Sequence, residues 1–382
     1  MFDKIIDRKN SSCSKYDNLE QYFGKTDLDP FWVADMDFEI PEFLQEAIQK
    51  RAQHNVFGYG KQNKEIFEAI KNWMSSQHQW NIDTSSISLC NGVVPAYAAC
   101  IEAFSNVDDE IIVQTPVYFP LFQCIKANNR KILENPLKED NGYYTMDLEH
   151  LKSIITPKTK MIALCSPHNP VGRVWNKEEL EDLANICIEN NITIVSDEIH
   201  SDLTFKKFIP IASINDKIAN ITVTLNSPGK TFNIAGLNAS YCITSNGKLK
   251  NTLDDIIKQR VIGTINVFGL IAMQCAYENG TQWLENLKKY LESNIDYTIE
   301  TLKNNTKIKV KKPEATYLLW LNFEEYNLSH QKIKEILLND CKVALNDGLT
   351  FGKNGKSHFR FNVATSKNQL KRGLNKIINF NK

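Results

Sequence analysis

The stretch MIALCSPHNPVGRVWNKEELEDLANICIENNITIVSDEIH (residues 161–200) decides the fold class. Met161–Cys165 and Thr193–Ser196 are nearly continuous apolar runs, which are typical of strands buried on both faces of a parallel sheet. Between them, Asn176 can cap a helix with Glu179 three residues later, and apolar residues then recur at helical spacing. Strand, helix and strand at this rhythm predict a βαβ unit.

The same pattern extends in both directions from this unit. An amphipathic helix is predicted over Lys64–Trp80, and further buried strands are predicted at Ile111–Val113, Thr222–Leu225 and Ser240–Ile243. We therefore expect an α/β domain around a mostly parallel sheet with helices on both faces.

After about residue 285 the pattern changes to that of a smaller α+β domain. A long helix is predicted from Trp283 to about Asn304, another helix at Gln331–Leu338, and strands at Lys307–Val310, Tyr317–Asn322 and His358–Asn362. The expected division is a large domain at residues 46–284 and a small domain built from residues 1–45 and 285–382.

The composition of the 382-residue chain limits which partners and which location we expect for the protein. Lys+Arg and Asp+Glu number 45 each, so no nucleic-acid partner is expected. The apolar segment Val261–Tyr277 contains polar residues and is predicted to be a buried helix, because a membrane span needs about 20 predominantly apolar residues. The first ten residues lack the apolar region of a secretory signal.

Nine cysteines are present, with no C-x-x-C pair and no zinc-like spacing, so we expect free thiols, no metal site and a cytoplasmic location.

Polar residues follow several predicted strands, where open α/β sheets bind ligands. Asp197 ends one strand, Asn169 lies in the turn after another, and Lys230 follows Thr222–Leu225 in NSPGKTFNIAG (226–236). Tyr118 lies just after Ile111–Val113. Taken alone, Lys230 is better explained as a solvated loop lysine, and chance could supply any one of these residues.

A helix start completes the set, because Asn91-Gly92-Val93 can present backbone N–H groups to an anion. Together these residues provide what a phosphorylated pyridine aldehyde needs. They supply a lysine amine for the aldehyde, a carboxylate for the ring nitrogen, an amide for the phenolic oxygen, an aromatic ring for one face and a helix N-terminus for the phosphate.

Several longer motifs resemble those of one enzyme family. SPHNPVG (166–172), SDEIH (196–200) and KTFNIAGL (230–237) are similar to pyridoxal-phosphate enzymes of the aspartate-aminotransferase fold type I. Within that superfamily, four stretches resemble the MalY/PatB group of cystathionine β-lyase-like C–S lyases: FWVADMDFEIP (31–41), VFGYG (56–60), NGVVPAY (91–97) and PEATYLLWL (313–321). The resemblance covers nearly the whole chain and implies pyridoxal 5'-phosphate as cofactor.

The resemblance also implies roles for individual residues. Lys230 matches the Schiff-base lysine, which also moves the Cα proton, and Asp197 the partner of the pyridine nitrogen. The other implied cofactor contacts are Asn169 at the ring's O3′, Tyr118 stacking on the ring, and Gly92, Val93 and Ser227 at the phosphate.

The substrate and a second subunit are implied by two further residues. Arg360 matches the arginine that grips the substrate carboxylate, for which a planar guanidinium is suited. Tyr59 matches a tyrosine that reaches the neighbouring subunit's cofactor, which implies a homodimer with shared active sites. Tyr59 or Tyr118 is also placed where it could assist proton transfer.

Three positions depart from the wider superfamily. His200 replaces a common tyrosine, and it is interpreted equally well as a packed histidine or as a cofactor contact. Asn238 stands where an arginine often binds phosphate, and Gly229 stands where serine is common. These departures leave phosphate binding more dependent on Ser227, backbone amides and Tyr59.

The predicted reaction is β-elimination from an L-cysteine S-conjugate such as L-cystathionine, giving a thiol, pyruvate and ammonia. A pyridoxal-phosphate-dependent aminotransferase remains an alternative, because it uses the same lysine, aspartate and arginine. A regulatory protein acting through surface contacts is a further alternative, but no helix-turn-helix signature or basic patch supports DNA binding.

Overall fold

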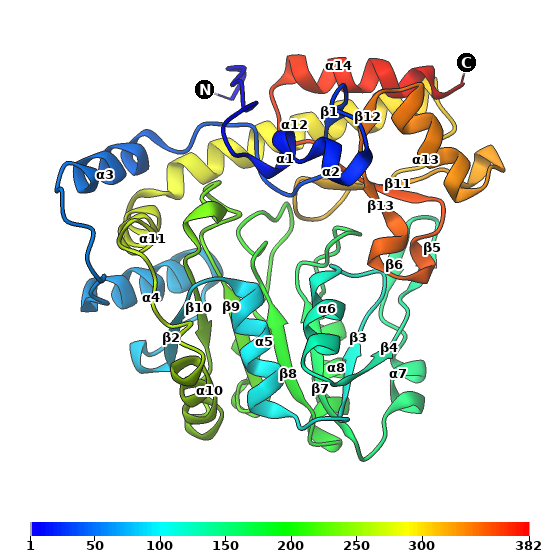
Figure 1. Cartoon of the computed structure of the whole chain (residues 1–382). Helices are drawn as coiled ribbons and strands as arrows, with labels where there is room; N and C mark the ends of the chain where they lie inside the picture. Colours follow the sequence, from blue (N-terminus) through cyan, green and yellow to red (C-terminus); the bar gives the residue numbers. More distant parts are fainter. Residues whose placement is uncertain (1, 382) are drawn as a thin grey trace.

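The computed structural model describes residues 2–381, and a seven-stranded sheet lies at its centre (Figure 1). The strand order is β2-β10-β9-β8-β7-β3-β4, and only β10 runs antiparallel to its neighbours. The α/β fold with a mostly parallel sheet is confirmed. The strands are β2 (Ile87–Cys90), β3 (Glu110–Val113), β4 (Lys131–Glu134), β7 (Thr159–Cys165), β8 (Thr193–Asp197), β9 (Thr222–Asn226) and β10 (Ser240–Ile243).

The five predicted strands of this sheet are all present, and the two that were missed, β2 and β4, form its edges. β4 has only two apolar residues, both half-buried, so it lacks the continuous apolar run of a central strand. The central strands β8 and β9 each extend one residue past their predicted ends, and β8 therefore ends on Asp197 itself.

Helices cover both faces of the sheet, as predicted. The side chains of β3 show how the faces divide, because Ile111 and Val113 belong to one apolar core and Ile112 to the other. The helices α5 (Val93–Phe104), α6 (Pro120–Ala127) and α10 (Gly247–Gln259) contribute to the first core, and α7 (Leu148–Ile154) and α8 (Lys177–Glu189) to the second.

The capping box predicted for α8 is confirmed. The Asn176 side chain accepts a hydrogen bond from the Glu179 N–H at 2.8 Å, and Glu179 accepts one from the Asn176 N–H at 2.9 Å. Both bonds satisfy N–H groups that the first turn leaves unpaired.

A third apolar core packs α3 (Glu42–Ala52), α4 (Lys64–His78) and α11 (Val267–Asn279) beside the β2–β10 end of the sheet. The helix predicted to begin at Lys64 is confirmed. The prediction of a single helix over Val261–Tyr277 is wrong at its start. Val261 is 70% exposed with φ +57°, and α11 begins only after Asn266, which caps it. No described helix is long and apolar enough to cross a membrane.

The C-terminal part forms a small three-stranded sheet of β11 (Leu318–Asn322), β14 (His358–Asn362) and β13 (Asn346–Asp347). The long α12 (Thr281–Asn305) packs against α14 (Lys367–Ile378), and α13 (His330–Asn339) packs against β12 (Val343–Ala344). The N-terminal β1 (Asp29–Pro30) pairs with β12, so the N-terminal segment packs onto the C-terminal part of the chain (Figure 1).

Two further predictions concern this region. The strand predicted at Lys307–Val310 is wrong, because Lys309 makes only an isolated bridge with Asn322 at the free edge of β11. The predicted domain boundaries fall inside α3 and α12, and the division into two domains stays a prediction. A hairpin of β5 (Lys138–Asp140) and β6 (Tyr143–Thr145) lies close to the small sheet (Figure 1).

Candidate active site

Most of the predicted site residues meet at one cavity, of about 310 Å³, where β3, β7, β8 and β9 end. Parallel strands present their carboxyl ends at the same edge of a sheet, so residues far apart in the sequence converge there. Eight of the ten predicted residues line this cavity: Gly92, Val93, Tyr118, Asn169, Asp197, His200, Ser227 and Lys230.

Lys230 lies in the turn after β9, and its Nζ donates a hydrogen bond to the Ala34 carbonyl oxygen at 2.6 Å. Burial lowers the pKa of Lys230 to about 8, because an ammonium ion is poorly solvated there. The amine is therefore neutral far more often than a free lysine at neutral pH. The next residue, Thr231, donates to Asp202 at 2.7 Å and helps to hold the turn in place.

Asp197 is the last residue of β8 and is buried. Its Oδ1 accepts the Ile199 N–H at 3.2 Å, and no other described protein group donates to the carboxylate. Burial raises the pKa of Asp197 to about 6, and the Lys230 ammonium opposes this change. A buried carboxylate with a free oxygen is suited to a protonated ring nitrogen.

Gly92 and Val93 begin α5 at one end of the cavity. Gly92 has φ +143°, which favours glycine, and its N–H donates to the Ser240 hydroxyl at 2.9 Å. The first N–H groups of a helix have no partner within the helix and attract anions. The cavity at this end is thus suited to a phosphate.

Ser227 lines the same cavity, and its hydroxyl already bonds to protein. It donates to the Ala239 carbonyl at 2.7 Å and accepts the Gly229 N–H at 3.0 Å. A Cβ on Gly229 would lie 3.0 Å from the Ser227 Oγ and 3.2 Å from the Ala235 Cα. This crowding accounts for glycine at a position where serine is common.

His200 and Tyr118 both line the cavity. Burial lowers the pKa of His200 well below its usual value, and the charges of Lys230 and Arg360 add to this effect. Its buried Nδ1 has no hydrogen-bond partner among the described residues. Tyr118 is half-buried, and burial raises the pKa of its phenol.

Arg360 lies on β14, behind Asn169 rather than on the cavity surface. Its Nη1 donates to the Asn169 Oδ1 at 3.0 Å, and its Nη2 donates to the Trp32 carbonyl at 3.0 Å and to the Asn346 Oδ1 at 2.5 Å. Its Nε is buried and has no hydrogen-bond partner among residues 2–381. Burial lowers the pKa of Arg360 to about 10, so the guanidinium stays charged at neutral pH.

Tyr59 is the other predicted site residue that does not line this cavity. Its side chain is 99% exposed, and it belongs to a connecting segment that also exposes Val56 and Phe57.

Sequence reasoning did not name several residues that contact the predicted site, among them Ala34 and Asn346. Ala34, whose carbonyl holds the lysine amine, lies within the motif at 31–41, so the sequence carried a signal for that segment. Asn346 contacts Arg360 from the short strand β13, and no motif indicated it.

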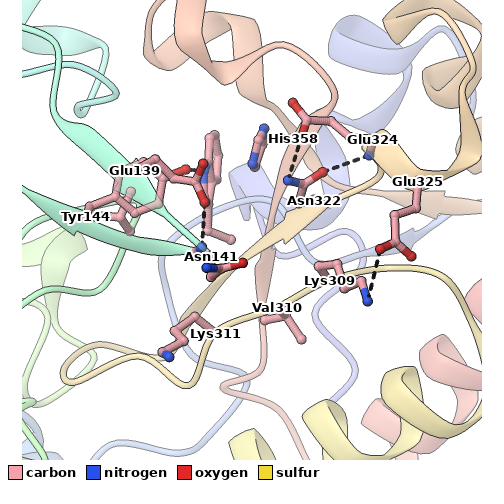
Figure 2. A pocket seen from close by; sticks show the side chains of 13 residues that line it. Glu139, Asn141, Tyr144, Lys309, Val310, Lys311, Asn322, Glu324, Glu325 and His358 are labelled. Carbon is pink, nitrogen blue, oxygen red and sulfur yellow. Dashed lines mark hydrogen bonds and ion pairs between the residues drawn. The ribbon is translucent and has the colours of Figure 1, made fainter.

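A larger cavity, of about 470 Å³, lies between the β5–β6 hairpin and the small sheet (Figure 2). It contains none of the predicted catalytic or cofactor residues. Within residues 2–381, no group of three or more His, Cys, Asp or Glu side chains is arranged to hold a metal ion.

The residues at the smaller cavity fit pyridoxal 5'-phosphate. The observation that tests the fit is a set of buried polar atoms without protein partners at its walls, the His200 Nδ1 and the Asn91 Oδ1. Buried polar atoms are normally paired, so their presence indicates a polar ligand. The lysine, the carboxylate and the helix N-terminus match that ligand's aldehyde, ring nitrogen and phosphate.

Comparisons with known proteins agree with this geometry. The model of the aminotransferase class I and II family matches residues 32–377. Cystathionine β-lyase PatB of Bacillus subtilis (strain 168) is 39% identical over 98% of both chains. A pyridoxal-phosphate-bound structure from Clostridium difficile 630, described as a candidate aminotransferase, has a TM-score of 0.98 at 41% identity and covers 100% of this chain and 99% of its own. A pyridoxal-phosphate-bound C–S lyase from Staphylococcus hominis has a TM-score of 0.91 at 31% identity, covering 100% and 98%.

Proposed function

The chain belongs to the aminotransferase class I and II family, and we propose that within it the protein is a pyridoxal-phosphate-dependent C–S β-lyase. Its substrates are L-cystathionine or other L-cysteine S-conjugates. With one water molecule, each yields a thiol, pyruvate and ammonium. The relative named a cystathionine β-lyase, matched over 98% of both chains, supports elimination as the reaction.

The single observation that carries the proposal is the convergence of Lys230, Asp197 and Arg360 on one buried region. A lysine amine, a buried carboxylate and a buried guanidinium are the three protein groups that this chemistry needs. Asp197 would hold the cofactor's ring nitrogen, Asn169 and Tyr118 its ring, and the start of α5 with Ser227 its phosphate. When bound, the cofactor supplies a sink for the electron pair released at the substrate Cα.

The chain's own residues position the substrate and move its proton. Arg360 binds the substrate carboxylate through guanidinium N–H donors, and the buried Nε leaves a donor available for it. Lys230 removes the proton from the substrate Cα. The lowered pKa of Lys230 favours this role, because only the neutral amine accepts a proton.

The sulfur departs as a thiolate or thiol. Thiols have a pKa near 8.5, so a strong general acid is not required for departure. Tyr118 lies at the same cavity and is the candidate in this chain for assisting proton transfer to the sulfur.

The active form is proposed to be a homodimer in which Tyr59 reaches the partner's site. The support is the position of Tyr59, which is fully exposed beside the exposed apolar side chains of Val56 and Phe57. Such a cluster is typical of a surface that another chain covers. A cytoplasmic location is also proposed, supported by nine cysteines that all remain free thiols.

The test compares two products from one substrate. Purified protein is incubated with S-benzyl-L-cysteine, with and without a keto acid, and thiol, pyruvate and amino transfer are measured. Equal amounts of thiol, pyruvate and ammonia without keto acid are expected. Amino transfer that requires a keto acid and releases no thiol would instead identify an aminotransferase, the alternative suggested by the description of the Clostridium difficile relative.

A second measurement locates the cofactor. Borohydride reduction should fix the cofactor's mass on the peptide that contains Lys230, and Lys230→Ala should show no labelling and no turnover. Lys206→Ala, which changes an exposed lysine outside the cavity, is the matched control and should be labelled like the native protein.

A further inference from the structure

The larger cavity has an aromatic wall that belongs to the small sheet. Trp320 on β11 stacks on His358 of β14, with ring centroids 5.2 Å apart and planes at 17°. The Trp320 Nε1 donates to the Tyr144 hydroxyl at 3.2 Å, which joins the wall to the β5–β6 hairpin. The cavity shares no lining residue with the candidate active site, so its occupant would differ from the substrate bound there.

His358 presents a hydrogen-bond acceptor at this cavity. It is only 7% exposed, and its Nδ1 lies 2.9 Å from the Lys356 carbonyl oxygen. A carbonyl only accepts, so Nδ1 carries the proton and Nε2 is left with a lone pair when the ring is neutral. Burial lowers the pKa of His358, which favours the neutral ring. No described protein group bonds to Nε2, although the side chain lines the cavity.

Two carboxylates flank this imidazole. Figure 2 shows His358 between Glu139 and Tyr144 on one side and Asn322 and Glu324 on the other. Glu139 and Glu324 line the same cavity as His358, and both carboxylates raise the pKa of His358 against the effect of burial. Neither carboxylate forms an ion pair with a described residue, and each has one oxygen without a protein donor.

The third acid at the cavity differs from these two. Glu325 is paired with Lys309 at 3.0 Å, so its charge is already balanced. Lys309 and Lys311 also line the cavity, below Glu139 and His358 in the view of Figure 2. These lysines disfavour a ligand with a second positive group, while Val171 and Val310 offer an apolar surface to its stem.

We propose that this cavity is an accessory site for a small organic amine with one primary ammonium group and an apolar stem. At this cavity the N–H donors of the ammonium have three acceptors available, the free oxygens of Glu139 and Glu324 and the His358 Nε2. Charge-assisted bonds to two carboxylates supply the affinity, and the aromatic wall excludes water from one side. The inference does not rest on the proposed function.

The test is a calorimetric titration with pentylamine, and with pentanol as an uncharged ligand of similar shape. Holoenzyme is first reduced with borohydride, so that an amine cannot exchange at the cofactor. Pentylamine should bind at millimolar concentration or below, and pentanol should bind at least about tenfold more weakly, because it forms no charge-assisted bond.

Variants assign the binding to this cavity. The double variant Glu139→Gln with Glu324→Gln should weaken pentylamine binding at least about tenfold. His358→Phe keeps a stacking ring but removes the acceptor, and it should also weaken binding. Glu325→Gln, on the same rim, is the matched control and should bind like the native protein. Equal binding of pentanol, unchanged binding in the double variant with an unchanged melting temperature, or no binding by the native protein would overturn the proposal.

Discussion

At the scale of one residue, the buried carboxylate of Asp197 lowers the stability of the cofactor-free protein. Burial raises its pKa to about 6, above the value of about 3.9 in an unfolded chain. Without cofactor, the native state therefore binds more protons than the unfolded state between about pH 4 and 6, and it loses stability as the pH rises through that window. Above pH 6 the cost of the buried charge is about 2–3 kcal/mol.

Asp197→Asn should therefore stabilise the cofactor-free protein and disable the enzyme. The melting temperature of the cofactor-free variant should exceed that of the native protein at pH 7.5, and the difference should vanish near pH 4. Turnover of S-benzyl-L-cysteine should fall at least about a hundredfold, because an amide does not keep the ring nitrogen protonated. Asp182→Asn, on the exposed side of α8, should change neither quantity. A lower melting temperature for Asp197→Asn at pH 7.5 would contradict this account.

At the scale of elements, Asp202 links α4 to the turn that carries Lys230. Its buried carboxylate accepts hydrogen bonds from Trp73 Nε1 at 3.0 Å, His78 Nε2 at 2.8 Å and Thr231 Oγ1 at 2.7 Å. Burial alone would raise the pKa of Asp202, but the bonds from His78, Thr231 and Trp73 outweigh burial and lower it. The position of Lys230 thus depends on a helix more than 150 residues earlier in the chain.

Asp202→Ala should leave three buried donors without an acceptor and cost about 3 kcal/mol or more. The melting temperature should fall, and the cofactor should dissociate faster on dialysis, because Thr231 loses its anchor beside Lys230. His78→Gln should have a smaller effect, since two of the three bonds remain. If Asp202→Ala melted like the native protein and kept its cofactor equally well, the proposed link between α4 and the lysine turn would be wrong.

At the scale of the whole molecule, Tyr59 decides whether each active site is built from two subunits or from one. Tyr59→Phe and Lys230→Ala subunits are mixed after each is shown to be weakly active alone. In a mixed dimer with shared sites, one site carries both changes and the other carries neither. Random pairing makes half of the dimers mixed, so about a quarter of native activity should return. Absence of recovery, with subunit exchange confirmed by mass labels, would contradict the shared site.

The sequence by itself determined the fold class and most of the residues that meet at the candidate active site. Buried parallel strands require apolar runs, and strand ends at one sheet edge require polar residues just after those runs, so Asp197, Asn169 and Lys230 were all predictable from local pattern. The apolar pattern did not predict the edge strand β4, because a strand with one neighbour needs no continuous apolar run. The segment Lys307–Val310 has residues typical of a strand, but it forms only a single β-bridge, between Lys309 and Asn322.

Only the tertiary structure decided which distant residues meet. It placed the Ala34 carbonyl on the Lys230 amine, Asn346 on Arg360, and Glu139 and Glu324 on either side of His358. The burial that shifts the pKa of Asp197 and Lys230 arises in the same way, from elements that pack together only in the folded chain. Local sequence specifies backbone conformation and which face is apolar, whereas contacts between segments far apart in the chain follow from how those faces pack.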